Sequence, residues 1–204
     1  MSPILQFLLA IGLAASCGLR AWLPLLAVGL AARFQWLSLH ESFLFLARMD
    51  ILAVLVIATV IELLADKIPA IDNLLDSISF FLRPVAGAVL ASSLMIPSDP
   101  GIAGILGVIF GGGAALSVHS AKALVRAKST ATAFAHGGLG NTTLSIAEDL
   151  IVGVLVLLTV WFPWLALAAA FILLAGAIGI IYLAVKAGKR IFRLFRRGEA
   201  SPDS

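Results

Sequence analysis

Long apolar stretches separated by short polar segments dominate the pattern of this chain. A helix needs about 20 consecutive apolar residues, with a range of roughly 17–25, to cross the hydrocarbon core of a bilayer. Six stretches approach or reach this length: Pro3–Leu19, Phe43–Ala65, Ser77–Pro97, Ile102–His119, Ile146–Phe162 and Leu165–Val185. The pattern therefore predicts an all-α membrane protein with about six transmembrane helices.

The composition supports a lipid environment. Hydrophobic residues make up 61% of the 204 residues and charged residues only 12%, and the mean hydropathy is +1.10. A soluble domain carries roughly 25% charged residues, because water must wet its surface. No Pro/Gly/Ser-rich linker divides the chain, so we expect a single transmembrane domain over residues 1–197 and a short polar tail over residues 198–204.

Basic residues at the ends of the apolar stretches predict the orientation. With the N-terminus in the cytoplasm, only Arg20, Arg33 and Arg48 face the outside, and the other Lys and Arg residues face the inside. This bias predicts that both termini are cytoplasmic. The net charge of +3 fits attraction to the lipid bilayer better than binding of nucleic acid, because the cations cluster where headgroups lie.

Two halves of the chain show a weak internal likeness. Residues 50–60 resemble residues 149–160 with a slip of one residue. Residues 3–97 and 102–185 are therefore possible repeat halves, which with three spans each would insert as inverted repeats. The alternative is that any two apolar stretches align this well. Segments 20–34 and 120–142 fit poorly as straight spans, and each is either interfacial or re-entrant.

Carboxylates next to apolar stretches are the main candidates for function. A charge at the centre of a membrane helix costs about 2.5–3.5 kcal/mol on insertion scales, so such residues are functional candidates by default. Helical spacing puts them in three stripes, each on one helix face. The candidates for a polar pathway or an ion-binding site are Glu62, Asp66, Asp72, Asp76, Arg83, Asn141, Ser145 and Asp149.

Two accounts of these residues stay open. In the first, the carboxylates line a cavity that binds a cation or relays protons, with Arg83 as an internal counter-charge. In the second, Asp72 lies in an interfacial loop, Asp76 and Arg83 form a structural pair, and Asp149 lies in an ordinary first helical turn, where carboxylates are favoured. Glu62 lies within an apolar stretch, and this position favours the first account.

The sequence gives no signature of a cofactor, a metal site or an enzyme. The three histidines and Cys17 lack the spacing of zinc ligands, and Gly111–Gly113 is not followed by the Lys-Ser/Thr pair of a phosphate loop. An enzyme acting on lipid, with His119 or His136 beside Asp149, is a further alternative.

Three segments carry a resemblance to a known family. They are residues 16–24 (SCGLRAWLP), 62–72 (ELLADKIPAID) and 136–149 (HGGLGNTTLSIAED). With these segments the chain resembles a bacterial membrane family catalogued as domain of unknown function 4126, over nearly its whole length. The resemblance implies a multi-pass protein of the bacterial inner membrane, and it implies no activity, substrate or catalytic residue.

These patterns together favour a transporter or channel for a small solute or ion, with the acidic stripes as its polar pathway. One chain offers few helices to enclose a pathway, so a homodimer is an additional expectation. The alternative function is a membrane scaffold, or a protein that organises lipid through its basic C-terminal segment.

Overall fold

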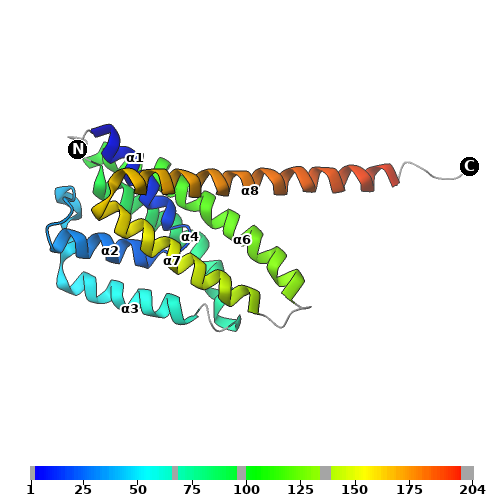
Figure 1. Cartoon of the computed structure of the whole chain (residues 1–204), viewed down its shortest axis with the longest axis horizontal. Helices are drawn as coiled ribbons and strands as arrows, with labels where there is room; N and C mark the ends of the chain where they lie inside the picture. Colours follow the sequence, from blue (N-terminus) through cyan, green and yellow to red (C-terminus); the bar gives the residue numbers. More distant parts are fainter. Residues whose placement is uncertain (1–2, 66–68, 96–99, 134–138, 199–204) are drawn as a thin grey trace, which may run out of the picture.

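The computed structural model describes residues 3–65, 69–95, 100–133 and 139–198, and the side chains within 4–65, 78–95, 101–126 and 145–190. Across these ranges the chain forms helices and no strands, as the apolar pattern predicts. The helices pack side by side in one bundle, and the last helix projects well beyond it (Figure 1).

The first two helices, α1 (Pro3–Ser16) and α2 (Trp22–Arg33), form a hairpin inside this bundle. α1 enters the bundle, the chain turns at residues 17–21, and α2 returns to the end from which α1 came (Figure 1). α1 forms the core, because its Ala10 and Ala14 are fully buried and it packs against α4 (Pro69–Leu94), α6 (Gly113–Ala133) and α8 (Pro163–Gly198). The predicted first span therefore ends deep in the protein and folds back.

The remaining elements run back and forth along the bundle (Figure 1). After α2 come η1 (Glu41–Ala47) and α3 (Met49–Ala65), then α4. The next run joins α5 (Pro100–Leu106), the π-helical turn η2 (Gly107–Gly112) and α6. α7 (Leu139–Trp161) and α8 follow.

Glycines let η2 approach α4 closely. A Cβ atom on Gly111 would lie 2.5 Å from the carbonyl oxygen of Gly87, and a Cβ atom on Gly87 would lie 2.7 Å from that of Gly111. Small residues of this kind are typical of helix contacts in membranes, where backbones pack directly against one another.

Six transmembrane helices are not confirmed. By length and apolar composition, the described residues contain two candidate spans, Gly101–Arg126 and Pro163–Arg190. A third exists if η1 and α3, which are bent by 63°, count as one broken span. Shorter apolar helices cover Ile4–Ser16, Trp22–Arg33 and Ile78–Leu94. The coarser prediction holds: this is an all-helical protein with apolar helices suited to a membrane.

The structure does not support the inverted repeat. In the first half the chain breaks between α1 and α2, whereas at the corresponding place in the second half α6 continues without a break through residue 133. The described part of segment 120–142 belongs to the end of α6 and the start of α7. In the bundle, α1 begins at one end and α8 ends beyond the other (Figure 1).

Candidate functional site

The break between α1 and α2 exposes backbone groups that helices normally satisfy internally. The first N–H groups of α2 and the last carbonyls of the α1 turn have no partner within their own helix. In the interior of a membrane protein, such groups must find partners in the protein or in bound water. Side chains from other helices supply these partners.

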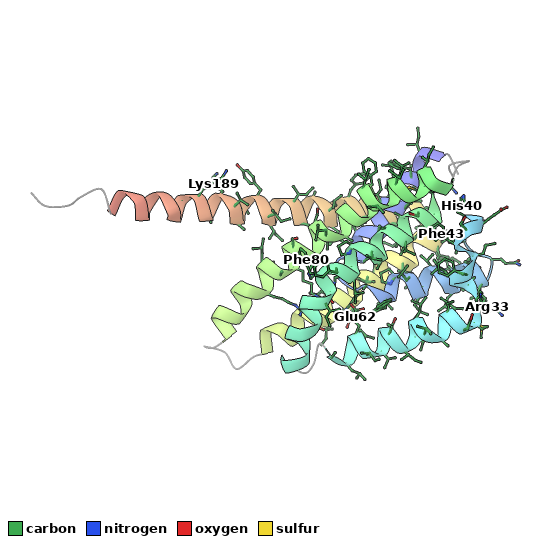
Figure 2. The ribbon with its side chains drawn as sticks, turned by 180° about the vertical axis from the view of Figure 1, so that it is seen from behind. Arg33, His40, Phe43, Glu62, Phe80 and Lys189 are labelled. Atoms are coloured by element: carbon green, nitrogen blue, oxygen red, sulfur yellow. The ribbon has the colours of Figure 1, made fainter. Side chains whose placement is uncertain are left out.

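Glu62 of α3 binds the start of α2. Its Oε1 accepts a hydrogen bond from the backbone N–H of Ala21 at 3.0 Å, and its Oε2 accepts one from Trp22 at 3.3 Å. The residue is buried, and it is labelled on α3 in Figure 2. A carboxylate at a helix N-terminus is also stabilised by the helix dipole.

Two cations bind the carbonyls of the same turn. Arg83 of α4 donates from Nη1 to the carbonyl oxygen of Gly18 at 3.3 Å. Lys122 of α6 donates from Nζ to that of Leu19 at 3.1 Å. Cations at the end of α1 and an anion at the start of α2 both match the sign of the local helix dipole.

Arg20, in the turn itself, connects the break to α7. Its side chain is fully buried, its Nη2 donates to Ser145 Oγ at 2.8 Å, and its Nε forms an ion pair with Asp149 Oδ1 at 2.6 Å. The turn is therefore held by side chains from α3, α4, α6 and α7.

These side chains also contact one another. Arg83 Nη2 lies 3.9 Å from Glu62 Oε1, and Arg83 Nη1 lies 2.6 Å from His119 Nδ1. A guanidinium has no acceptor, so Nδ1 accepts this bond and carries no proton. Glu148 Oε2 forms ion pairs with Lys122 Nζ at 2.7 Å and with Arg126 Nη2 at 3.5 Å. We name this cluster the polar centre: Arg20, Glu62, Arg83, His119, Lys122, Arg126, Ser145, Glu148 and Asp149.

The polar centre carries charges of both signs. Its described members include four permanent or usual cations and three carboxylates, and only the Asp149 side chain, at 27%, is substantially exposed. Burying so many charges costs several kcal/mol per ion before pairing is counted. The predicted acidic pathway is thus, within the described side chains, a network of alternating acids and bases. Among the described residues, no three His, Cys, Asp or Glu side chains group as a metal site requires.

The structure brings together part of the predicted set. Glu62, Arg83, Ser145 and Asp149 meet in the polar centre. Asp66 lies outside the described residues, as do the side chains of Asp72, Asp76 and Asn141, and His136.

Five members of the polar centre were absent from the predicted set. Two signals in the sequence point to four of them: Arg20 stands alone between apolar stretches, and His119, Lys122 and Arg126 share a helix face at spacings of three and four. The fifth member, Glu148, has no such signal, because its partners lie on another helix.

Comparison with known proteins places the chain in a family. Residues 7–182 match the family described as Domain of unknown function (DUF4126). The chain belongs to this family. Every member of the polar centre in this DUF4126 protein falls within the matched range, and the earlier resemblance is confirmed. No curated protein and no solved structure matches the chain.

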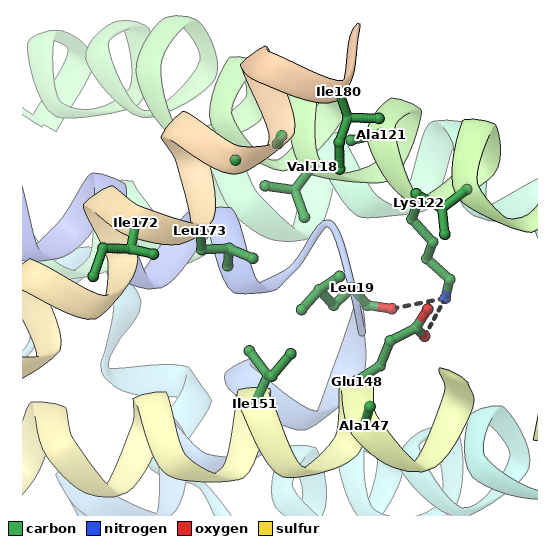
Figure 3. A pocket seen from close by; sticks show the side chains of 13 residues that line it. Leu19, Val118, Ala121, Lys122, Ala147, Glu148, Ile151, Ile172, Leu173 and Ile180 are labelled. Carbon is green, nitrogen blue, oxygen red and sulfur yellow. Dashed lines mark hydrogen bonds and ion pairs between the residues drawn. The ribbon is translucent and has the colours of Figure 1, made fainter. Parts of the chain in front are cut away.

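A groove lies beside the polar centre of this DUF4126 protein. It has a volume of about 310 Å³ and is lined by α6, α7 and α8, mostly through apolar side chains such as Val118, Ile151, Leu173 and Ile180. Leu19 and the Lys122–Glu148 ion pair also line it, and the ion pair lies away from Ile172 and Leu173 (Figure 3). The groove therefore has walls from α6, α7 and α8 and reaches Leu19 in the turn between α1 and α2.

Proposed function

We propose that this protein is an integral membrane transporter or channel for a small solute or ion, with the polar centre as part of its pathway. One observation carries the proposal: a helix breaks inside the bundle, and charged side chains from three other helices bind its backbone ends. Discontinuous helices of this kind form the binding sites of many transporters. Charges inside membrane helices also mark ion and solute pathways far more often than they serve as lipid contacts.

The placement in the membrane follows from charge and aromatic residues. Lys186, Lys189 and Arg190 are exposed near the far end of α8, and the rest of the basic segment follows them. We assign this end to the cytoplasm of a bacterial inner membrane, because cytoplasmic ends are enriched in Lys and Arg. Trp36 and Trp161 are exposed at the opposite end, as in an aromatic belt. In this arrangement α1 begins on the outer side, and α1–α2 is re-entrant.

Movement of a solute requires that the contacts of the polar centre exchange. Arg83 lies between Glu62 and His119, so a shift of its guanidinium toward one partner weakens the contact with the other. Such an exchange would alter how firmly Glu62 holds the start of α2. The break in the helix is thus the element that we expect to move during transport.

The test is flux in proteoliposomes. The purified protein is reconstituted, a membrane potential is applied, and uptake of Na⁺, K⁺, Cl⁻, protons and a panel of small neutral and charged solutes is measured. Glu62→Gln removes the charge that holds α2, and we expect it to lower the flux about tenfold, since loss of a charged hydrogen bond is worth 1.4 kcal/mol or more.

The matched control is Asp50→Asn, which removes a carboxylate from the exposed Arg48–Asp50 pair on the same helix. We expect it to leave the flux unchanged. The proposal is wrong if the wild-type protein moves none of these probes, or if the two folded variants transport equally well.

The basic segment after Val185 favours a second function, a scaffold or lipid-organising protein. Removing Arg193–Ser204 separates the two, because a scaffold loses its partner in pull-down experiments and a transporter keeps its flux. The expected homodimer belongs with the transport proposal, and chemical cross-linking in native membranes tests it directly.

A further inference from the structure

The groove between α6, α7 and α8 combines an apolar wall with a particular position in the bundle. Two of the helices that line it contain the candidate membrane spans Gly101–Arg126 and Pro163–Arg190. Its α8 wall consists of Ile172, Leu173, Gly176, Ala177 and Ile180, at the spacing of a single helix face. If these two helices span the bilayer, a groove between them lies within its hydrocarbon core.

The glycine at the middle of this wall leaves space. A Cβ atom added to Gly176 meets no other atom within 4 Å, although Gly176 lines the groove. The cavity volume of about 310 Å³ lies at the lower end of the range for small-molecule sites, roughly 300–1,000 Å³. Its lining is mostly apolar and is therefore suited to hydrocarbon.

Basic side chains lie beyond the groove at a distance that matches a lipid. Lys186 is ten residues past Gly176, which is about 15 Å along a helix, or half of the roughly 30 Å hydrocarbon core. Arg190 is fourteen residues past Gly176, or close to four full turns, and therefore lies on about the same face. Both side chains are exposed. An acyl chain that reaches Gly176 would have its headgroup at these two cations.

We propose that the groove is a binding site for an anionic phospholipid, with one acyl chain between α6, α7 and α8 and its phosphate at Lys186 and Arg190. The acyl chain gains little from burial itself, because the bilayer is equally apolar. Selection of the lipid therefore depends on the headgroup, and basic residues near a membrane surface supply this selectivity. The bound chain also touches Leu19 and the Lys122–Glu148 pair, which line the groove, so the lipid also stabilises the broken helix.

The test uses phosphatidylglycerol with a diazirine on one acyl chain, in vesicles of phosphatidylcholine that contain the full-length protein. After irradiation, mass spectrometry should place the label on α6, α7 and α8 residues of the groove, above the level on the lipid-facing side of α3. Unlabelled phosphatidylglycerol should compete about 25-fold better than unlabelled phosphatidylcholine, since each of the two basic residues contributes a factor of about five. This measurement on the wild-type protein needs no variant.

Paired variants test where on α8 the acyl chain binds. Gly176→Leu fills the groove, and we expect it to reduce labelling there at least threefold. Gly179→Leu adds the same side chain on α8, at a glycine that also has no atom within 4 Å of a Cβ but does not line the groove, and we expect labelling to persist. Arg190→Gln and Lys186→Gln together should abolish the preference for the anionic lipid.

Three outcomes would overturn the inference: labelling spread evenly over all lipid-facing helices, equal competition by phosphatidylcholine, or unchanged labelling in folded Gly176→Leu. Competition by a free fatty acid at the same concentration would show a carboxylate amphiphile as the occupant, which also overturns it. None of these outcomes depends on the flux assay, so the lipid site and the transport proposal can fail separately.

Discussion

α1 and α8 are both strongly apolar helices, yet the bundle uses them in opposite ways. α1 has 14 residues, lies at the centre and ends at a turn held by charged side chains. α8 has 36 residues, has no break, and exposes large side chains such as Phe171, Ile172 and Tyr182 along its length. Apolar content is therefore a poor guide to which helix forms the core of a membrane protein.

What separates the two helices is the size and polarity of particular residues. α1 carries small residues that let other backbones come close: a Cβ atom on Gly12 would lie 2.6 Å from that of Ala170. The chain after α1 then supplies backbone groups for Glu62, Arg83 and Lys122 to bind. α8 instead exposes large apolar side chains, such as Phe171 and Ile172, on the outside of the bundle. The predictions below test this contrast.

The largest effect on stability is expected from Glu62→Ala. The change removes the carboxylate that accepts hydrogen bonds from the Ala21 and Trp22 N–H groups and that pairs with Arg83. Breaking a buried ion pair from one side costs about 3–5 kcal/mol, and we expect a loss of this size in the free energy of unfolding, measured by denaturant titration in detergent.

The control for Glu62→Ala is Asp50→Ala on the same helix. Asp50 pairs with Arg48 at 2.6 Å, but both side chains are more than half exposed. We expect no measurable change, since exposed ion pairs contribute little. Equal losses of unfolding free energy in the two variants would show that Glu62 contributes no more than an exposed charge. The proposed role of the break between α1 and α2 would then be wrong.

An intermediate effect on the free energy of unfolding is expected from Gly→Ala changes. Its sign should differ between α8 and the turn after α1. A Cβ atom on Gly18 would collide with the carbonyl oxygen of Ala115 and lie 2.6 Å from Val118 Cβ, and overpacking costs about 1–3 kcal/mol. A Cβ atom on Gly179 in α8 meets nothing within 4 Å. There, Ala should stabilise the helix by up to about 1 kcal/mol.

Thermal unfolding of both glycine variants in the same detergent provides the comparison. Destabilisation by Gly18→Ala with stabilisation by Gly179→Ala supports close packing at the turn and open space along α8. If Gly18→Ala is neutral, the turn is not packed against α6 as described.

The sequence predicted the helical class well, because hydrophobic runs are a local signal. It also indicated that Arg20–Arg33 does not continue a straight span, since Pro24 and Gly29 interrupt it. It left open whether this segment is interfacial or re-entrant, because the direction of the chain after the turn depends on what the turn contacts. In the structure these contacts come from Glu62, Arg83 and Lys122.

Members of the candidate site could be predicted only where the sequence of a single helix marks them as unusual. Glu62 stands out because a carboxylate within an apolar stretch is costly wherever it lies. Arg20 was assigned to the outer side and Lys122 to the inner side from charge bias alone. The partner of Arg20 is 125 residues away, and no pattern within a single sequence reports a pairing at that distance. In a sequence, a buried basic residue cannot be told from an interfacial one unless the acidic residue that pairs with it is known.

The smallest effect on the free energy of unfolding is expected from two Ser→Ala changes. One removes a hydrogen bond between helices, and the other removes a hydrogen bond within a helix. Ser145 Oγ accepts a hydrogen bond from Arg20 across the bundle, at 2.8 Å, and the residue is buried. Ser145→Ala should cost about 1–2 kcal/mol, because a hydrogen bond to a charged group is lost while Arg20 keeps its ion pair with Asp149. Ser117 donates instead to the Gly113 carbonyl oxygen of its own helix, at 2.8 Å. Ser117→Ala should be neutral or slightly stabilising, since Ala favours the helix.

Denaturant titration of both serine variants measures these two effects. A double-mutant cycle that combines Ser145→Ala with Asp149→Asn then tests whether the two residues act together on Arg20. If Ser145 and Asp149 jointly position Arg20, the two changes are coupled, and their combined effect departs from the sum of the single effects by 0.5 kcal/mol or more, about the lower limit for residues in one network. Additive effects would mean that Arg20 has other partners sufficient to hold it. In that case the link between the turn and α7 is weaker than the links to α3, α4 and α6, and movement at the break would begin on the α7 side.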